Sequence, residues 1–566
     1  MLLKKIKWIV LLIAAIILIA VIIYLVSAMG KDKASQTVPT HDQNSATITN
    51  SSAATTTPAP TVAPTTDIAD SKPIKVYLNG IQVIFNEKPV GNDINALVPM
   101  NELIKAFNAN VEYDEKAGTL KADRDGQEVS FKMDEKVIYI DSVKKEIDTA
   151  PEVVQGTVLV PLQAVAEGFG AQVVWDDKSN SAILTTGDTK EANNWVGTWA
   201  ASPYLVTPDN MPPDPGLANN TLRQVIRVSI SRDQLRLKFS NEYGEAPLTM
   251  NSVHLAVSDG GSAIKADTDK AITFGGEEAV TIPAGETVTS DTIAYHIDGL
   301  ASMTITISFG DMPSRLTGHP GSRTTSFIDV GNTVTAQTMP SAVTTERWYV
   351  ISGIDVLTDD TYRSVVILGD SITDGRGTTT DKNNRWTDIL ANRLQEFPAT
   401  THIGVLNQGI GGNSLMFGGL GPTAVSRFDR DVLGQSGVRY LIIMEGVNDI
   451  GGASSSEKTV TDLINQLKEL IKKAHEHNIL VYGATLTPFG GSSYDINQNE
   501  QLRKKYNDWI RTSGEFDGVI DFDTAVAWKD NTKILLPMYD SGDHLHLKPF
   551  GYKVMGDIID LDLFTR

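Results

Sequence analysis

The chain has 566 residues, which is too long for one domain and enough for several hydrophobic cores. Its formal net charge is −20, with 69 acidic against 49 basic residues, and it shows no basic patch, so nucleic acid is not expected as a partner. Cysteine is absent, which excludes disulfides, thiolate metal sites, a cysteine nucleophile and a lipid-modified cysteine.

Residues 1–30 predict a short cytoplasmic segment followed by a transmembrane anchor. Residues 8–26 form an apolar run of 19 residues behind Lys4, Lys5 and Lys7, long enough to cross a hydrocarbon core of about 30 Å. The N-terminus is then cytoplasmic and the rest of the chain extracellular, as at a Gram-positive cell surface. The alternative is a cleaved secretory signal, which would make the protein secreted, although signal cores are usually shorter, about 7 to 15 residues.

Residues 31–72 consist mainly of Thr, Ser, Ala and Pro and predict a disordered linker. Residues 73–187 then contain an internal repeat, because residues 96–114 recur as residues 158–176 at a constant offset of 62. Each copy predicts a short strand, a helix with Pro in its first turn and a second strand ending in Asp.

This repeat resembles the copper amine oxidase N-terminal-like domain, a small α+β module. The segment contains neither His nor Cys, so no metal site is expected, since carboxylates alone suit copper poorly. Its expected role is that of a spacer or of an attachment to cell wall or carbohydrate polymer.

Residues 194–350 predict an all-β sandwich or jelly-roll domain. Short runs of alternating apolar and polar residues, such as 224–231, 234–240 and 302–309, are separated by Gly, Asn, Asp and Pro. Trp195 and Trp199 near its start are interpreted as core or domain-packing residues, with sugar stacking as the alternative.

Residues 363–566 predict an α/β domain with a parallel sheet, because continuous apolar strands alternate with helical segments. The expected strands are residues 364–368, 404–406, 440–444, 479–484 and 518–520. The expected helices are residues 385–397, 457–477, 497–511 and 551–561. Ligands of such sheets bind at the carboxyl ends of the strands.

Four polar motifs follow strands of this domain or precede its last helix. Ser371 comes in a tight turn where a strand meets the start of a helix, whose free amides can stabilise an oxyanion. A glycine-rich loop contains Gly412, the third strand is followed by Asn448, and Asp543 and His546 precede the last helix. A serine needs a neutral imidazole to accept its proton, and residues three apart in a turn can face the same way.

These four motifs resemble those of the SGNH/GDSL serine hydrolase family over about residues 363–566. The resemblance implies a three-layer flavodoxin-like fold, with Ser371 as nucleophile and Asp543 and His546 completing a catalytic triad. It implies an oxyanion hole of Ser371, Gly412 and Asn448. No metal or organic cofactor is implied.

Several nearby polar residues have simpler interpretations. His544 adjoins Asp543, but the side chains of neighbouring residues point apart, so His546 is favoured as the base. His475 and His477 are interpreted as cations at the end of a helix, not as metal ligands. Asp370 and Asp449 are expected to hydrogen-bond local backbone. Asp374, Arg385 and Trp386 either line the cleft or serve packing.

The predicted function is that of an extracellular, membrane-tethered serine esterase. Residues 194–566 resemble secreted family members found with xylan-degrading enzymes, which implies short acyl groups on a polysaccharide as substrate. The alternatives are a lysophospholipase or lipase, a broad arylesterase, and a catalytically inactive cell-wall-binding protein. Residues 415–417 are a candidate flap for a long acyl chain.

Overall fold

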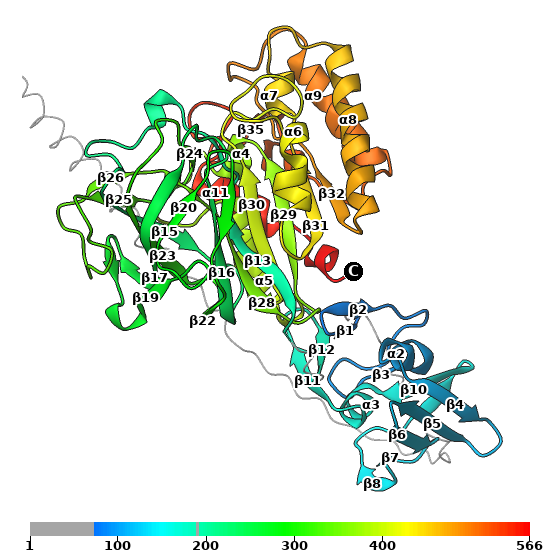
Figure 1. Cartoon of the computed structure of the whole chain (residues 1–566). Coiled ribbons are helices and arrows are strands. Elements are labelled where there is room, and N and C mark those ends of the chain that lie inside the picture. The colour runs from blue at the N-terminus through cyan, green and yellow to red at the C-terminus, as the bar shows by residue number, and fades with distance from the viewer. Residues whose placement is uncertain (1–72, 188–191) are drawn as a thin grey trace, which may run out of the picture. The chain divides into compact units, whose positions relative to one another are not determined.

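A computed structural model describes residues 73–187 and 192–566 (Figure 1). The predicted anchor at residues 8–26 and the predicted linker at 31–72 lie outside the described residues. Within the two described ranges, no helix has the length and apolar character needed to cross a membrane.

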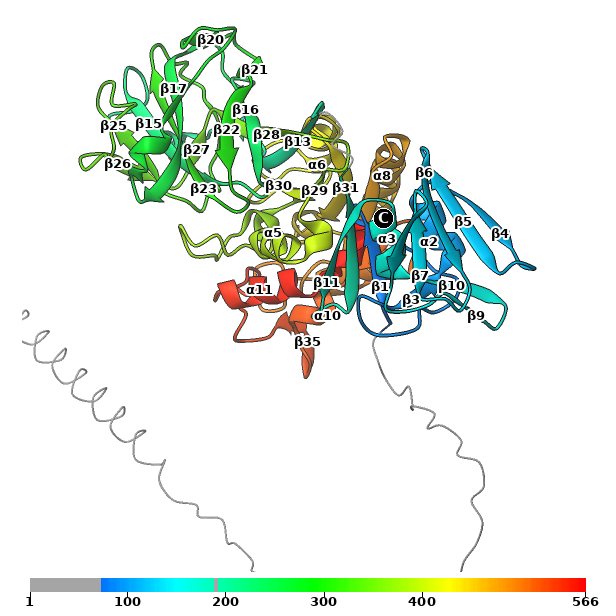
Figure 2. The same ribbon diagram turned by 90° about the horizontal axis from the view of Figure 1, so that it is seen from below.

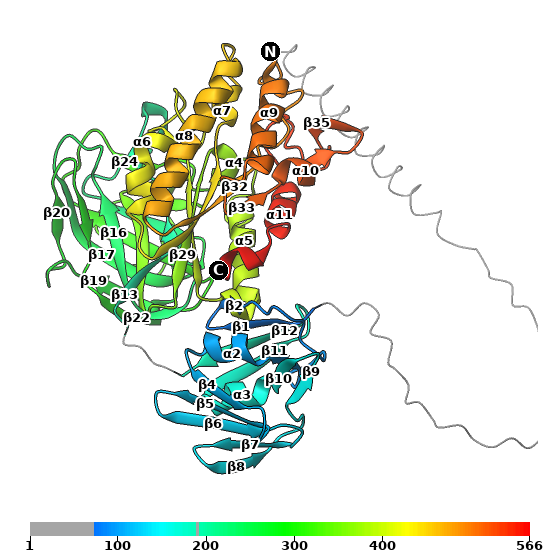
Figure 3. The same cartoon turned by 90° about the vertical axis from the view of Figure 1, so that its right-hand side faces the viewer.

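Residues 73–187 form a small α+β unit, coloured blue and cyan in Figure 3. The two repeats contain the same elements in the same order. The first has β3 (Leu97–Pro99), α2 (Met100–Ala106) and β4 (Asn110–Asp114), and the second has β10 (Thr157–Pro161), α3 (Leu162–Gly168) and β11 (Ala171–Asp176). The remaining strands are β1 (Lys75–Leu78), β2 (Ile81–Val83), β5 (Thr119–Arg124), β6 (Gln127–Lys132), β7 (Val137–Ile140), β8 (Val143–Glu146), β9 (Glu152–Val154) and β12 (Ser181–Thr186).

The two repeats pack against each other in this unit. Strands β3 and β10 pair antiparallel, and the equivalent rings of Phe107 and Phe169 lie 5.3 Å apart in one core. Pro99 and Pro161 end their strands and cap the following helices, one position earlier than the first-turn placement that the sequence predicted. Proline suits this boundary because its fixed φ matches both the end of a strand and the start of a helix.

The following all-β region consists of antiparallel sheets around one core. Its longer strands are β13 (Asn194–Ala200), β15 (Thr221–Arg227), β16 (Arg232–Ser240), β17 (Leu248–Gly260), β23 (Ser302–Phe309) and β28 (Ile351–Thr358). Strand β28 pairs with both β13 and β16, so this region extends past residue 350. Trp199 packs edge-to-face on Trp348 within the core, which agrees with its interpretation as a packing residue.

The C-terminal part has a five-stranded parallel sheet in the order β30-β29-β31-β32-β33. Its strands are β29 (Arg363–Gly369), β30 (Ile403–Gly409), β31 (Val438–Met444), β32 (Leu480–Ala484) and β33 (Gly518–Ile520). The strand order changes direction between β29 and β31, and doubly wound sheets bind ligands at such a point. The predicted α/β domain with a parallel sheet and the preceding all-β region are therefore present.

Helices cover both faces of this sheet (Figure 2). Alternate strand residues pack against α8 (Glu457–Glu476) and α9 (Asn499–Thr512) on one side, and against α5 (Trp386–Glu396) and α11 (Pro549–Asp557) on the other. Trp386 is fully buried in the core between the sheet and the helices α5 and α11, which makes it a packing residue. Double coverage explains why the strands read as continuous apolar runs.

The all-β region and the parallel sheet meet closely along β13 and β30. The amide of Gly197 donates to the carbonyl of Ser436 at 2.9 Å. A Cβ on Gly404 would lie 2.1 Å from the carbonyl oxygen of Gly197. Only glycine allows the two backbones to approach in this way, and the seam brings residues of the all-β region next to the nucleophile turn.

Candidate active site

Ser371 is the first residue of the short helix α4 (Ser371–Asp374), immediately after β29. The Asp370 side chain caps this helix by accepting the Ile372 amide at 2.8 Å. A Cβ on Gly369 would lie 2.2 Å from Oγ1 of Thr373, so this turn requires glycine at position 369. Ser371 is 5 % exposed, which shields its hydroxyl from bulk water.

His546 and Asp543 lie in line with this hydroxyl. Nε2 of His546 is 2.7 Å from Oγ of Ser371, and Nδ1 is 2.6 Å from Oδ2 of Asp543. The second carboxylate oxygen of Asp543 accepts the amides of Leu545 and His546, at 3.1 and 2.9 Å. This arrangement fixes both the ring and the carboxylate, and it selects the tautomer with a proton on Nδ1.

The pKa values of His546 and Asp543 are both lowered, but for different reasons. Burial lowers the pKa of His546 below its usual value, and the Asp543 carboxylate only partly opposes this. Burial alone would raise the pKa of Asp543, but hydrogen bonds from the His546 amide and ring, and that ring's charge, hold this pKa well below the usual range. At neutral pH an ionised Asp543 therefore faces a neutral His546, as a general base requires.

The predicted oxyanion residues come from the ends of the two neighbouring strands. Gly412 follows β30 and adopts a φ of +71°, a conformation that favours glycine. The side-chain amide of Asn448 donates from Nδ2 to the carbonyl of Asn413 at 2.6 Å, and its Oδ1 accepts the Tyr494 hydroxyl at 2.7 Å. An amide nitrogen carries two N–H groups, so the second one remains for a ligand.

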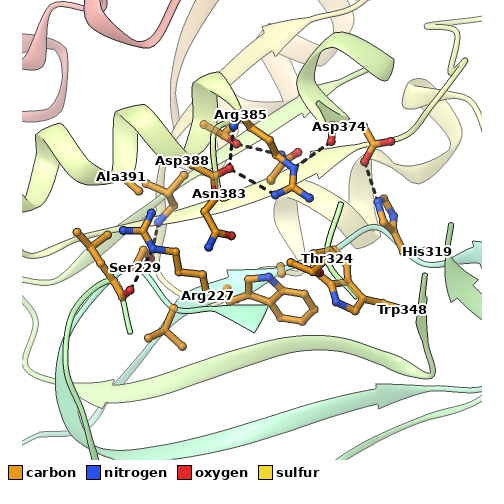
Figure 4. A pocket seen from close by; sticks show the side chains of 18 residues that line it. Arg227, Ser229, His319, Thr324, Trp348, Asp374, Asn383, Arg385, Asp388 and Ala391 are labelled. Atoms are coloured by element: carbon orange, nitrogen blue, oxygen red, sulfur yellow. Dashed lines mark hydrogen bonds and ion pairs between the residues drawn. The ribbon is translucent and has the colours of Figure 1, made fainter. Parts of the chain in front are cut away.

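Two residues of the all-β region contact the nucleophile helix directly. Nε2 of His319 lies 2.9 Å from Oδ1 of Asp374, and Nη2 of Arg323 lies 3.0 Å from its Oδ2. Figure 4 shows the His319–Asp374 contact at the edge of a cavity of about 50 Å³, with Trp348 and Arg385 nearby. Burial opposes ionisation of Asp374, but Arg323 and His319 outweigh it and lower its pKa.

Sequence reasoning did not single out His319, Arg323 or Tyr494. They lie in segments without a recognisable motif, and their roles depend on contacts with residues far away in the sequence. Arg385 and Asp374 are buried structural partners, because Nε of Arg385 donates to the Asp374 carbonyl at 3.0 Å.

The other candidate residues also have protein partners. The expectation that Asp449 bonds the backbone of its own turn is wrong, because it accepts the amides of Leu415, Met416 and Phe417, which lie in the loop after β30, and so it organises the loop that was a candidate flap. His544 is exposed and pairs with Asp540 at 2.6 Å, not with Asp543. Over residues 73–187 and 192–566, no group of three or more His, Cys, Asp or Glu side chains could hold a metal ion.

A serine at a strand-to-helix turn, hydrogen-bonded to a histidine at the carboxyl edge of a parallel sheet, is the arrangement of a serine hydrolase. Residues 367–554 match the GDSL-like Lipase/Acylhydrolase family, and residues 77–184 match the Copper amine oxidase N-terminal domain. The chain therefore contains a GDSL/SGNH lipase-acylhydrolase domain and, before it, a copper amine oxidase N-terminal domain.

Several solved structures are similar to about a third of the chain. A GDSL-like lipase from Bacteroides thetaiotaomicron is 20% identical, with 35% of this chain and 85% of that chain covered and a TM-score of 0.27. A lipolytic G-D-S-L family member from Veillonella parvula is 18% identical, covering 36% and 99%, with a TM-score of 0.27. A catalytic mutant of an acetylxylan esterase from Geobacillus stearothermophilus is 18% identical, covering 36% and 96%, with a TM-score of 0.28. No curated protein matches the chain.

Proposed function

We propose that the chain is an extracellular, membrane-tethered serine esterase that acts through an acyl-enzyme. The proposal depends on one observation, the unbroken hydrogen-bond chain from Asp543 through His546 to Ser371. In it, Ser371 is the nucleophile, His546 the general base and Asp543 the residue that orients the imidazole. Asp543 stays ionised throughout, since its hydrogen bonds to His546 and to the Leu545 amide hold its pKa well below the usual range.

In the first half-reaction, Nε2 of His546 takes the Ser371 proton as Oγ attacks the ester carbonyl carbon. The amides of Ser371 and Gly412 and the free N–H of Asn448 stabilise the resulting oxyanion. The tetrahedral intermediate then collapses, and the alcohol leaves with the proton held by His546. Water attacks the acyl group in the same way and releases the carboxylic acid.

The proposed substrates are short acyl groups on a polysaccharide. The resemblance of residues 194–566 to secreted members found with xylan-degrading enzymes supports this class. An anchor at residues 8–26 would hold the enzyme at the cell surface, where residues 73–187 would act as a spacer or contact cell-wall polymer.

A lysophospholipase or lipase is the second candidate, and the loop after Gly412 favours it. Phe417 is 59% exposed and Leu420 55% exposed, and together they could accept an acyl chain. A broad arylesterase would use the same surface. An inactive cell-wall-binding protein is less well supported, because such a protein has no need of an aligned Ser371, His546 and Asp543.

The test compares acetyl and long-acyl chromogenic esters on the full chain, with Ser371→Ala as the matched variant. Acetyl preference supports the polysaccharide esterase, whereas long-chain preference supports the lipase. Activity that survives in Ser371→Ala would contradict the mechanism. Binding to insoluble xylan and peptidoglycan is compared between the full chain and a chain that lacks residues 73–187. Weaker binding without these residues indicates attachment, and equal binding indicates a spacer.

A further inference from the structure

Arg376 lies at the rim of the candidate active site and is held there by its backbone. Its N–H donates to the carbonyl of Ser371 at 2.9 Å, and its own carbonyl accepts the Tyr552 hydroxyl. At the next position, a Cβ on Gly377 would lie 2.3 Å from the carbonyl oxygen of Leu547, so this loop packs against the segment that carries His546. The Arg376 side chain is exposed and has no hydrogen bond or ion pair to the described residues.

Arg323 reaches the same site from the all-β region. Its backbone has a φ of +53°, an unfavourable conformation for arginine, and its carbonyl accepts the Asp381 amide at 3.0 Å. Only Nη2 contacts Asp374, while the buried Nε has no partner among the described residues. The side chain is 26% exposed, so a guanidinium with five N–H groups has donors to spare beside open solvent.

The exposed carboxylates at this rim and Asp374 already have partners. Asp374 pairs with His319 and Arg323, Asp543 with His546, and Asp540 with His544. Arg376 has none of these partners, so its charge is available to a ligand.

Electrostatics support the closeness of both arginines to the reacting groups. Burial is the main reason that the pKa of His546 lies below its usual value, and Asp543 opposes it. Arg376 and Arg323 add to the lowering, so both charges act on the imidazole. The Arg376 charge also acts on Tyr494, whose hydroxyl holds Asn448.

We infer that Arg323 and Arg376 form an anion-binding subsite beside Ser371, and that the substrate is an ester carrying a carboxylate or phosphate near its acyl group. This inference rests on the proposed esterase function and specifies its substrate class. Planar guanidinium groups bind carboxylate and phosphate oxygens in paired hydrogen bonds. The subsite needs both regions of the chain, because the all-β region supplies Arg323 and the nucleophile loop supplies Arg376.

The test measures acetate release by the full chain from two matched pairs of esters. One pair is a monoacetylated methyl xyloside and a monoacetylated methyl glucuronide, and the other is monoacetylglycerol and its phosphate. We expect kcat/KM for at least one anionic ester to exceed that of its neutral partner about tenfold at low salt, the scale of one charged hydrogen bond. Added salt should reduce this ratio.

Arg376→Gln should then lower kcat/KM for the anionic ester about tenfold, mainly through KM, and change the neutral ester less than about twofold. Arg376→Lys should recover part of the loss. Lys472→Gln is the matched control, an exposed cation near the far end of α8, and should change neither ester. Arg323→Gln provides a second variant with the same expected direction.

Two results would contradict the proposed anion-binding subsite. One is an equal kcat/KM for neutral and anionic esters, and the other is an equal loss of kcat/KM for both on Arg376→Gln. If the neutral esters are still cleaved in a manner that depends on Ser371, the proposed function survives that result. If wild type cleaves none of the four esters, the proposed function itself fails. Preference for the glucuronide or for the phosphate identifies which anion the subsite takes.

Discussion

The hydroxyl of Tyr494 donates to Oδ1 of Asn448 at 2.7 Å, while Nδ2 of Asn448 donates to the Asn413 carbonyl at 2.6 Å. These two contacts fix the plane of the amide and the position of its remaining N–H. The Tyr494 ring is itself held close to Gly451, where a Cβ would lie 2.4 Å from the ring. Tyr494 is therefore a positioning residue for the proposed oxyanion donor.

Tyr494→Phe should lower kcat about fivefold and leave KM nearly unchanged, because it removes one hydrogen bond that orients Asn448. Asn448→Ala removes the donor itself and should cost about 10²- to 10³-fold. Steady-state kinetics on an acetyl ester measure both. In the Asn448→Ala background the tyrosine substitution should have no further effect; an undiminished fivefold loss there would contradict the positioning role.

The pH dependence of kcat/KM should follow the protonation of His546. Only the neutral ring can accept the Ser371 proton, and burial lowers its pKa below the ordinary 6.5. Activity should therefore fall as the pH is lowered, with its half-maximal point below pH 6.5. Rates measured on one acetyl ester in buffers of constant ionic strength check this, and a half-maximal point above pH 6.5 would contradict the described environment of the ring.

Removing the buried carboxylate of Asp374, which lies where the all-β region contacts the helix α4, should destabilise the protein. Asp374 is 2% exposed and pairs with His319 and Arg323. Asp374→Asn removes the negative charge and one of the two acceptor oxygens, so it leaves Arg323 or His319 without its acceptor and should cost about 3 kcal/mol in the free energy of unfolding. Denaturant unfolding measures the change. Asp508→Asn on the exposed face of α9 is the control, and should change stability by less than about 0.5 kcal/mol.

Asp370 should make the protein less stable as the pH rises. Burial raises its pKa from 3.8 to about 7, so the folded state holds a proton that the unfolded state releases between these values. The contribution of Asp370 to the free energy of unfolding is then greatest below about pH 4 and falls by up to about 4 kcal/mol as the pH rises through about 7. Burial and the charge of Asp370 also raise the pKa of Glu445.

Asp370→Asn should remove this loss, because an amide has no charge to bury and still offers an oxygen to the Ile372 amide. The variant should gain stability relative to wild type between pH 5 and pH 8 in denaturant unfolding. A constant difference between the two proteins across that range would show that Asp370 carries no proton in the folded state.

Local sequence patterns predicted much of the fold. The strand Ser302–Phe309 and the strand Gly518–Ile520 have the predicted bounds, because each apolar run ends at residues that break the ladder. The last helix begins at Pro549 and ends at Asp557, earlier at both ends than predicted. Proline favours the first turn of a helix, a signal that pointed to the true start.

The side chains predicted for the catalytic triad also come together. His546 lies within hydrogen-bond distance of Ser371 through one ring nitrogen and of Asp543 through the other. Each belongs to a motif whose chemistry is local: a serine at a strand-to-helix turn, and a carboxylate three residues before a histidine. The contacts of His319, Arg323 and Tyr494 have no such local signature.

The sequence by itself determined the alternation of strands and helices, the nucleophile turn and the residue types able to perform acyl transfer, because these depend on interactions between near neighbours in the chain. Tertiary structure alone decided that His319 and Arg323 of the all-β region reach Asp374, and that Tyr494 orients Asn448. Such pairs form where separate elements pack together, and their register depends on the shapes of whole surfaces, which no periodicity along the chain records.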